Sequence, residues 1–232
     1  MSKKRAFAVI ITVVLVLLSV CACAAESEEI IIACVGDSLT YGVIPNTAGK
    51  QTENPYPMVL DQLLGEGFDV QNYGKPGSTL TEFGPCYRNR DAYQPSLDAA
   101  AQMYIIMLGT NDSNLGEKWD AVAFENDLKD MVDTYRAVNS EAIIYLIAPP
   151  EVFPNVETGE IQMDEGLLRN EIRSIIEGVA QEKEAKYIDL FAETENHPEW
   201  VGGDGIHFLD EGYMQIGQII YENIKNDVPS RQ

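Results

Sequence analysis

Three residues have the types that serine-dependent acyl transfer requires: Ser38 near the start of the chain, and Asp204 and His207 near its end. A serine hydroxyl is a weak nucleophile until a neighbouring base takes its proton, and histidine can be that base. Asp204 precedes His207 by three residues, so its carboxylate can reach the second ring nitrogen and orient the imidazole. His197 has no acid at that spacing, so His207 is the predicted base. The alternative for Ser38 is an ordinary helix cap, because Gly-Asp-Ser also occurs at strand-to-helix turns.

An acyl-transfer site also needs hydrogen-bond donors where the negative charge of the tetrahedral intermediate develops. The Ser38 N–H, at the start of a predicted helix, is one donor that the helix dipole strengthens. The backbone N–H of Gly77 and the side-chain amide of Asn111 are two more, and glycine has no side chain to obstruct a substrate. Each has a structural alternative, as a turn glycine after Pro76 and a turn asparagine. The predicted oxyanion hole is therefore Ser38, Gly77 and Asn111.

The elements that must position these residues follow from the apolar pattern. Nearly continuous apolar runs predict buried strands, and apolar residues at helical spacing predict helices between them. The predicted strands are 30–35, 68–73, 103–108, 142–148 and 185–189, and the predicted helices are 56–64, 95–101, 119–138, 164–183 and 211–225. Their alternation indicates an α/β fold, three-layered and flavodoxin-like, with a parallel sheet of about five strands flanked by helices. Ligands bind beyond the carboxyl ends of such strands, where the candidate residues are expected to meet.

Four short segments carry the candidate residues, each just after a predicted strand or before the last predicted helix. They are GDSL at 36–39, NYGKPGST at 72–79, GTND at 109–112 and DGIH at 204–207. Together they resemble the blocks of the SGNH, or GDSL-type, hydrolase family, whose four naming residues match Ser38, Gly77, Asn111 and His207. Asp204 matches the triad acid of that family. The resemblance runs from about residue 30 to 224 and implies a flavodoxin-like α/β fold that hydrolyses carboxylic esters and some thioesters without a metal or other cofactor.

The second segment departs from the family pattern around Gly77. Lys75 and Pro76 precede the glycine where small residues are usual, and Ser78 follows it where aspartate is frequent. Gly77 is still the predicted oxyanion donor, but the resemblance does not predict the geometry of its loop.

Composition excludes several function classes. The chain of 232 residues has 37 acidic and 16 basic residues, a formal net charge of −21 that would repel nucleic-acid phosphates. No nucleic-acid partner is expected. With two histidines and only Cys34 and Cys86 beyond the N-terminal region, neither a structural zinc site nor a disulfide is predicted. Oligomeric state is not indicated by the sequence.

The N-terminal residues have the pattern of an export signal. Lys3, Lys4 and Arg5 precede an apolar run over 6–20 that is too short for a comfortable membrane span. The run ends in Val-Cys-Ala-Cys, which looks like a bacterial lipobox with Cys23 as the lipidated residue. Ordinary cleavage before Ala25 is the alternative. We expect residues 1–23 to be a signal peptide of lipoprotein type and 24–232 a single catalytic domain, exported and either lipid-anchored at the cell membrane or secreted.

The resemblance implies a serine esterase that removes acetyl or other short acyl groups from carbohydrates, because chains of that family with a short N-terminal anchor and no lipid-binding insertions often resemble carbohydrate O-acetyl esterases. The expected partner is thus a small-molecule or glycan ester. A second hypothesis is an acyl hydrolase of lysophospholipase or thioesterase type, and a third is a catalytically silent surface protein that binds glycans. Five aromatic residues near the predicted site could stack on sugar rings or only pack the loops: Tyr41, Tyr56, Tyr87, Tyr93 and Trp200.

Overall fold

The computed structural model describes residues 29–229, so the predicted signal peptide and Cys23 lie outside the described residues. At its centre is a five-stranded sheet in the order β2-β1-β3-β4-β5. All neighbouring strands run parallel. The strands are β1 (Ile30–Gly36), β2 (Phe68–Gly74), β3 (Met103–Met107), β4 (Ile143–Ile147) and β5 (Lys186–Ile188). Every predicted strand is present with ends within one residue of the prediction, and the predicted α/β fold class is confirmed.

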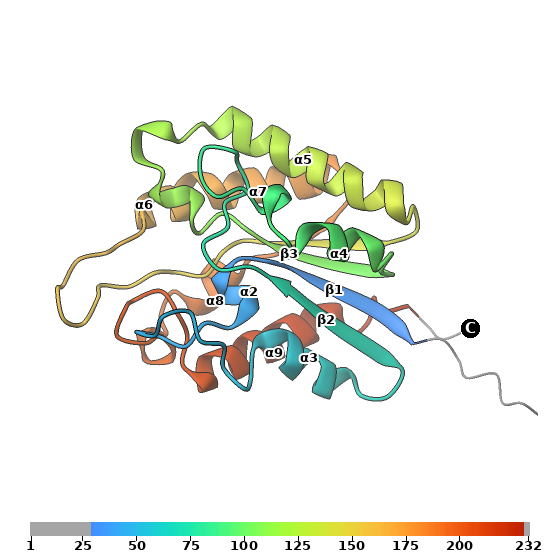
Figure 1. Cartoon of the computed structure of the whole chain (residues 1–232), viewed down its shortest axis with the longest axis horizontal. Helices are drawn as coiled ribbons and strands as arrows, with labels where there is room; N and C mark the ends of the chain where they lie inside the picture. Colours follow the sequence, from blue (N-terminus) through green and yellow to red (C-terminus); the bar gives the residue numbers. More distant parts are fainter. Residues whose placement is uncertain (1–28, 230–232) are drawn as a thin grey trace, which may run out of the picture.

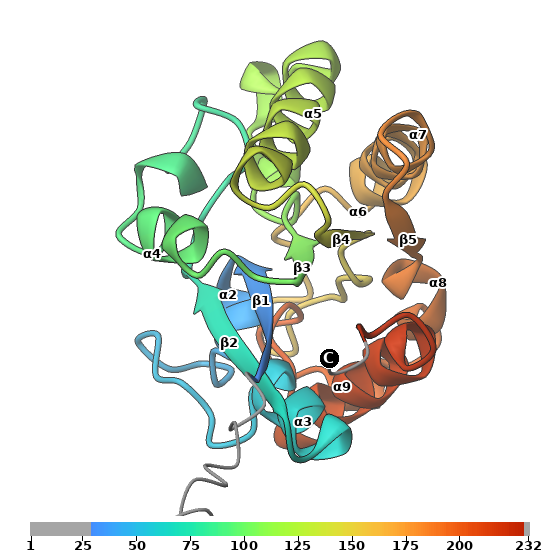
Figure 2. The same ribbon diagram turned by 90° about the vertical axis from the view of Figure 1, so that its right-hand side faces the viewer.

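Helices cover both faces of the sheet, as Figures 1 and 2 show. The helices α4 (Tyr93–Asp98), α5 (Ala121–Val138) and α7 (Arg173–Glu182) lie on one face. The helices α3 (Tyr56–Leu64) and α9 (Asp210–Ile224) lie on the other. Three short helices complete the fold: α2 (Ser38–Tyr41), α6 (Glu165–Leu167) and α8 (Leu190–Thr194). Among residues 29–229, no helix combines the length and the apolar character needed to cross a membrane.

Three of the five predicted helices differ from the structure for local reasons. The helix predicted from 119 begins at Ala121, because the Asp120 carboxylate caps it by accepting from the N–H groups of Val122 and Ala123. The helix predicted over 95–101 occupies Tyr93–Asp98, and the left-handed backbone of Ala100, with φ +45°, follows its end. The helix predicted over 164–183 is interrupted by a π-helical turn at Leu168–Ile172, which apolar spacing alone does not reveal.

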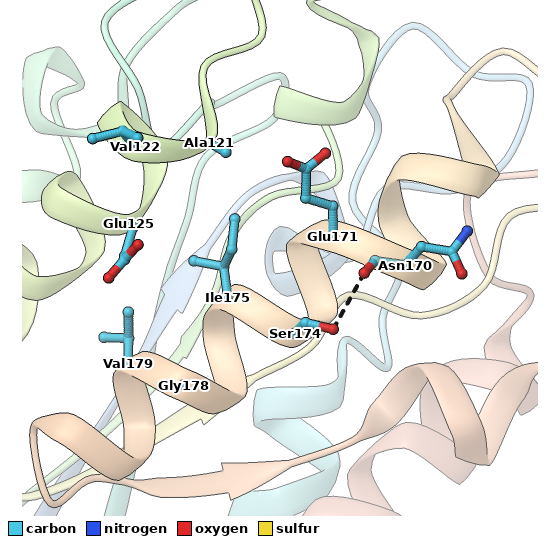
Figure 3. Close-up of a pocket in the computed structure, with 9 residues that line it drawn as sticks. All are labelled: Ala121, Val122, Glu125, Asn170, Glu171, Ser174, Ile175, Gly178 and Val179. Carbon is cyan, nitrogen blue, oxygen red and sulfur yellow. Dashed lines mark hydrogen bonds between the residues drawn. The ribbon is translucent and has the colours of Figure 1, made fainter.

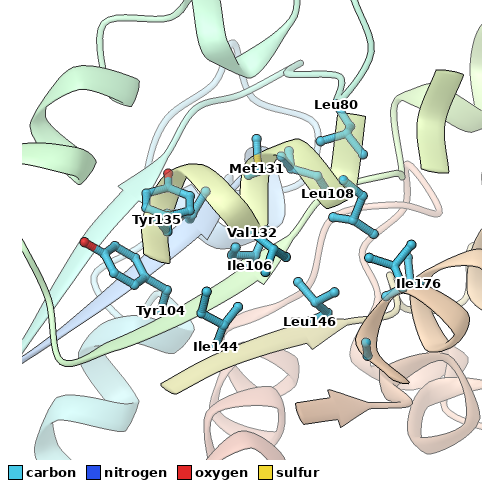
Figure 4. Packing of buried hydrophobic residues seen from close by; sticks show 14 of the residues in the cluster. Leu80, Tyr104, Ile106, Leu108, Met131, Val132, Tyr135, Ile144, Leu146 and Ile176 are labelled. Atoms are coloured by element: carbon cyan, nitrogen blue, oxygen red, sulfur yellow. The ribbon is translucent and has the colours of Figure 1, made fainter. Parts of the chain in front are cut away.

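Two apolar clusters, one on each face, hold the strands in place. Alternate residues of β1 enter different clusters, Ala33 and Val35 on one side and Ile32 and Cys34 on the other. Figure 4 shows part of the first cluster, where side chains of β3 and β4 such as Ile106 and Leu146 pack against α5. The strand ends that carry the candidate residues therefore project from a core that is packed on both sides.

Candidate active site

The three predicted catalytic residues form one hydrogen-bonded chain at the carboxyl edge of the sheet. Ser38 is the first residue of α2, directly after β1, and its Oγ lies 3.0 Å from His207 Nε2. On the other side of the ring, His207 Nδ1 lies 2.9 Å from Asp204 Oδ2. When the ring proton is on Nδ1 and donated to Asp204, Nε2 accepts from the Ser38 hydroxyl. This is the arrangement in which serine can be activated by a general base.

Asp204 is held by donors to both carboxylate oxygens. Its Oδ1 accepts from the N–H groups of Ile206 at 3.0 Å and His207 at 2.9 Å, and the N–H of Asn46 lies 3.2 Å from Oδ2. Burial opposes ionisation of this carboxyl group, but the hydrogen bonds from the His207 ring and from the backbone of His207 and Ile206 hold its pKa well below the usual range. Asp204 is therefore an anion throughout the neutral range, as a partner of an imidazolium must be.

The turn between Asp204 and His207 depends on a glycine. Gly205 has φ +76°, and a Cβ at this position would lie 2.0 Å from the Phe153 carbonyl oxygen. The Phe153 N–H donates to the Gly205 carbonyl at 2.8 Å, so the loop after β4 packs directly on this turn. The Gly202 N–H closes the turn by donating to the His207 carbonyl at 2.8 Å. These contacts aim the His207 ring at Ser38.

The predicted oxyanion-hole residues border the same cavity. A cavity of about 220 Å³ is lined by Ser38, Gly77, Asn111 and His207. The Ser38 N–H lies in the first turn of α2, where no intrahelical acceptor exists. Gly77 has φ +75°, and its N–H donates to no other residue of the described 29–229 segment. Two backbone donors are thus available at the cavity.

The loop around Gly77, which the sequence left undetermined, is fixed by its neighbours. The Lys75 ammonium pairs with Asp91 at 2.6 Å, and the Arg90 guanidinium donates to the Pro76 carbonyl at 3.1 Å. The unusual Lys75 and Pro76 therefore anchor this loop through Asp91 and Arg90, and Pro76 and Gly77 both line the cavity.

The side chain of Asn111 has contacts that the sequence did not predict. Its Nδ2 lies 3.1 Å from Asp37 Oδ2 and 3.0 Å from the Ser78 carbonyl oxygen. Asp37 is fully buried and also caps α2, its Oδ1 accepting from the Leu39 N–H at 2.9 Å. Burial raises the pKa of Asp37 to about 6, against the opposing effect of that backbone hydrogen bond. The sequence offered Ser38 as the possible helix cap, whereas the structure has Asp37 as the cap, and the contact of Asp37 with Asn111 joins residues 74 apart.

Asp112 is a second buried carboxyl group that sequence reasoning missed. It accepts from the N–H groups of Leu80 at 2.8 Å and Thr81 at 3.0 Å, and from the Thr81 hydroxyl at 2.9 Å. Burial raises its pKa. This residue ties the segment after β2 to the segment after β3, so Gly77 and Asn111 are held at one place.

None of the five aromatic residues named from the sequence lines the cavity at Ser38. Tyr56 and Tyr87 are fully buried and pack inside the protein, where no sugar can reach them. Tyr41, Tyr93 and Trp200 are partly exposed. Trp200 is stacked on His197, with the ring centroids 3.7 Å apart, which accounts for the second histidine of the chain.

A wider groove of about 360 Å³ lies between α5 and α7, away from this site (Figure 3). Glu125 and Glu171 flank it, and its serine, Ser174, donates to the Asn170 carbonyl at 3.2 Å. No histidine lines the groove, so its serine lacks the imidazole base that Ser38 has. Within residues 29–229, no cluster of three or more carboxyl, imidazole or thiol groups is arranged to hold a metal ion.

Comparison with known proteins agrees with this geometry. Residues 34–215 match the GDSL-like Lipase/Acylhydrolase family. An acetylxylan esterase of Xylanibacter ruminicola is 28% identical over 221 residues, which cover 87% of this chain and 44% of that protein. The chain therefore spans less than half the length of this relative.

Solved structures show the same fold at low sequence identity. The lipase/acylhydrolase from Enterococcus faecalis has a TM-score of 0.69 and 22% identity, covering 88% of this chain and 100% of that chain. A carbohydrate acetylesterase from Sinorhizobium meliloti has a TM-score of 0.68 and 21% identity, covering 85% and 99%. At these identities the likeness establishes a shared architecture.

Proposed function

The chain belongs to the GDSL-like Lipase/Acylhydrolase family, and on that premise we propose that it hydrolyses carboxylic esters with Ser38 as the nucleophile. The observation that carries the proposal is the chain of hydrogen bonds from Ser38 Oγ through both nitrogens of His207 to Asp204. A helix cap needs no histidine, and a glycan-binding pocket needs no ionised acid behind it. The catalytically silent alternative leaves this arrangement without a purpose.

In the proposed mechanism, His207 Nε2 takes the hydroxyl proton as Ser38 Oγ attacks the ester carbonyl, and Asp204 stabilises the imidazolium. The negative oxygen of the tetrahedral intermediate accepts from the N–H groups of Ser38 and Gly77, with Asn111 as the third donor. The alcohol then leaves with the proton from His207. Water attacks the acyl-serine while His207 takes its proton, and release of the acid restores the Ser38 hydroxyl.

We propose that the acyl group is short, acetyl above all, and that the alcohol belongs to a carbohydrate. The cavity of about 220 Å³ is smaller than the ~300–1,000 Å³ of sites for larger ligands. Five residues wall it around the nucleophile: Val43, Thr47, Gly49, Met163 and Ile206. A relative that is 28% identical over 87% of this chain is an acetylxylan esterase, which supports an acetylated glycan as the substrate.

The test compares wild type with Ser38→Ala on a series of chromogenic esters from acetyl to palmitoyl. We expect the acetyl ester to be hydrolysed fastest and Ser38→Ala to remove the activity, while Ser174→Ala, at the serine of the α5–α7 groove, leaves it unchanged. A preference for long chains would contradict the short-acyl proposal. Wild-type rates in Ser38→Ala would contradict ester hydrolysis at this site. Release of acetate from acetylated xylan then tests the carbohydrate half.

We further propose that residues 1–23 direct export and that Cys23 carries the lipid anchor. The basic residues, the apolar run and the terminal Val-Cys-Ala-Cys support this. Mass spectrometry of the mature N-terminus from a bacterial host tests it, with Cys23→Ala as the control. A diacylglyceryl group on Cys23 is expected, whereas an unmodified terminus at Ala25 would indicate ordinary secretion.

A further inference from the structure

The amide of Asn111 is clamped between two parts of the proposed oxyanion hole. Its Nδ2 donates to Asp37 Oδ2, beside the nucleophile, and to the Ser78 carbonyl, beside Gly77. An amide nitrogen has two hydrogens, so without substrate both have acceptors in the protein, and one must turn from its acceptor to the oxyanion when the tetrahedral intermediate forms. The orientation of the Asn111 side chain is therefore set by these two oxygens. Only the oxygen of Asp37 belongs to a side chain, so only that contact can be removed by a substitution.

Asp37 connects this clamp to the nucleophile turn. Its Oδ1 accepts from the Leu39 N–H at 2.9 Å and so holds the first turn of α2, which presents the Ser38 N–H. Its Oδ2 accepts from Asn111 at 3.1 Å. One fully buried carboxyl group thus contacts the proposed donor Asn111 through one oxygen and, through the other, holds the turn that presents the Ser38 N–H.

We propose that Asp37 is a positioning residue for the oxyanion hole, acting through Asn111 as well as through the helix cap. This inference rests on the proposed ester hydrolysis. Asp37 touches neither substrate nor reacting atoms in the mechanism. It holds in place the side chain of Asn111, which is the proposed donor to the oxyanion. An oxyanion hole is effective because its donors are preorganised.

The chemistry explains why the position holds an aspartate rather than another good helix cap. Asparagine and serine cap helices about as well as aspartate does. Asparagine, however, has a single acceptor oxygen, so it can serve Leu39 or Asn111 but not both. Serine retains an oxygen for the cap and has no second acceptor for Asn111. Only a carboxyl group offers an acceptor to each donor. Burial raises the pKa of Asp37 to about 6, so at neutral pH both oxygens are acceptors.

The experiment is a double-mutant cycle between Asp37→Ser and Asn111→Ala, measured as kcat and KM on an activated acetyl ester. Asp37→Ser keeps the cap and removes the contact with Asn111. We expect it to lower kcat about tenfold with KM within about twofold, because the lost interaction serves the transition state. In the Asn111→Ala background the same change should lower kcat less than about twofold. Asp120→Ser, the same substitution at the exposed cap of α5, is the matched control and should leave both constants unchanged.

An equal loss in both backgrounds, or no loss in either, would overturn the positioning role. If Asp37→Ser does not fold, Asp37→Asn replaces it in the cycle, with the same expected coupling. Ser38→Ala separates this inference from the proposed function. If Ser38→Ala is inactive and the cycle is additive, only the role of Asp37 fails. If Ser38→Ala keeps the wild-type rate, ester hydrolysis at this site and the role of Asp37 fail together.

Discussion

Two aspartates stand on opposite sides of the nucleophile, and their surroundings give the same carboxyl group opposite properties. Asp204 accepts from the His207 ring and from the backbone N–H groups of Ile206 and His207 in its own turn. Its pKa lies well below the usual range despite burial. Asp37 is fully buried, with the negative charge of Asp112 nearby, and its pKa is raised to about 6. The balance between desolvation and donors, rather than residue type, decides which aspartate can stabilise a cation.

The difference also separates two kinds of catalytic contribution. In the proposed mechanism Asp204 interacts with a ring that becomes positively charged, so its charge acts on the transition state. Asp37 interacts with Asn111, which stays neutral, so Asp37 contributes by holding the Asn111 side chain in place. Identical substitutions on the two sides should therefore have effects of very different size.

The largest expected effect is that of Asp204→Asn. An asparagine at this position has no negative charge to stabilise the imidazolium. If its NH₂ group faces His207 Nδ1, it also favours the wrong tautomer of the ring. We expect kcat to fall about 10⁴-fold at neutral pH, as for the corresponding change in other triads, against about tenfold for Asp37→Asn. Steady-state kinetics on an acetyl ester measures both. Losses of equal size would contradict the distinction between a charge effect of Asp204 and a positioning effect of Asp37.

Asn111→Ala should have the next largest effect. It removes one oxyanion donor and also the partner of Asp37 Oδ2. A loss of about 10²- to 10³-fold in kcat is expected, with KM little changed. The circular dichroism spectrum should match that of wild type, which distinguishes a lost donor from a lost fold. A loss of only a few-fold would remove Asn111 from the oxyanion hole and leave the two backbone donors.

These two sides of the site also differ in how far the sequence predicted them. The strands β1, β3 and β4 were predicted to within one residue because strands buried on both faces appear as nearly continuous apolar runs. The edge strands β2 and β5 are less buried and were predicted equally closely from shorter apolar signals. Asp204 and His207 were predicted because their spacing is local. The bond from Asn111 to Asp37 joins residues 74 apart, and that from Leu80 to Asp112 joins residues 32 apart. Such bonds depend on the packed arrangement of loops, while the aspartates themselves look like ordinary turn residues.

The pH dependence of stability should run in opposite directions for the two aspartates. The folded-state pKa of Asp37, about 6, exceeds its unfolded value, so its contribution to stability is complete below about pH 4 and is lost as the pH rises through 6. The folded-state pKa of Asp204 is lowered, so its contribution is present above about pH 4 and is lost as the pH falls.

Urea unfolding from pH 3 to 8 measures these contributions as differences between wild type and variants. Relative to Asp37→Ser, wild type should lose up to about 3 kcal/mol of unfolding free energy between pH 4 and 7. Relative to Asp204→Asn, wild type should gain stability as the pH rises from 3 to about 5. Parallel profiles for wild type and both variants would contradict the opposite pKa shifts.

The smallest expected effect is that of substitutions at Asn46, in a loop that contacts Asp204 from outside the 204–207 turn. Asn46 has φ +56°, a conformation that asparagine and glycine tolerate better than other residues, and its N–H lies 3.2 Å from Asp204 Oδ2. Asn46→Ala should cost about 1 kcal/mol of unfolding free energy through backbone strain and lower kcat a few-fold as the N–H moves off the carboxylate. Asn46→Gly keeps both the backbone conformation and the N–H, so it should restore kcat.

Thermal unfolding and kcat on the acetyl ester, measured on both variants, decide whether the backbone or the side chain of Asn46 matters. A loss of kcat in Asn46→Gly equal to that in Asn46→Ala would assign the effect to the asparagine side chain. If neither variant changes kcat, the donors within 204–207 suffice to hold the triad acid. The support of Asp204 would then be entirely local, in contrast to that of Asp37, whose partner Asn111 is brought in by a different strand of the sheet.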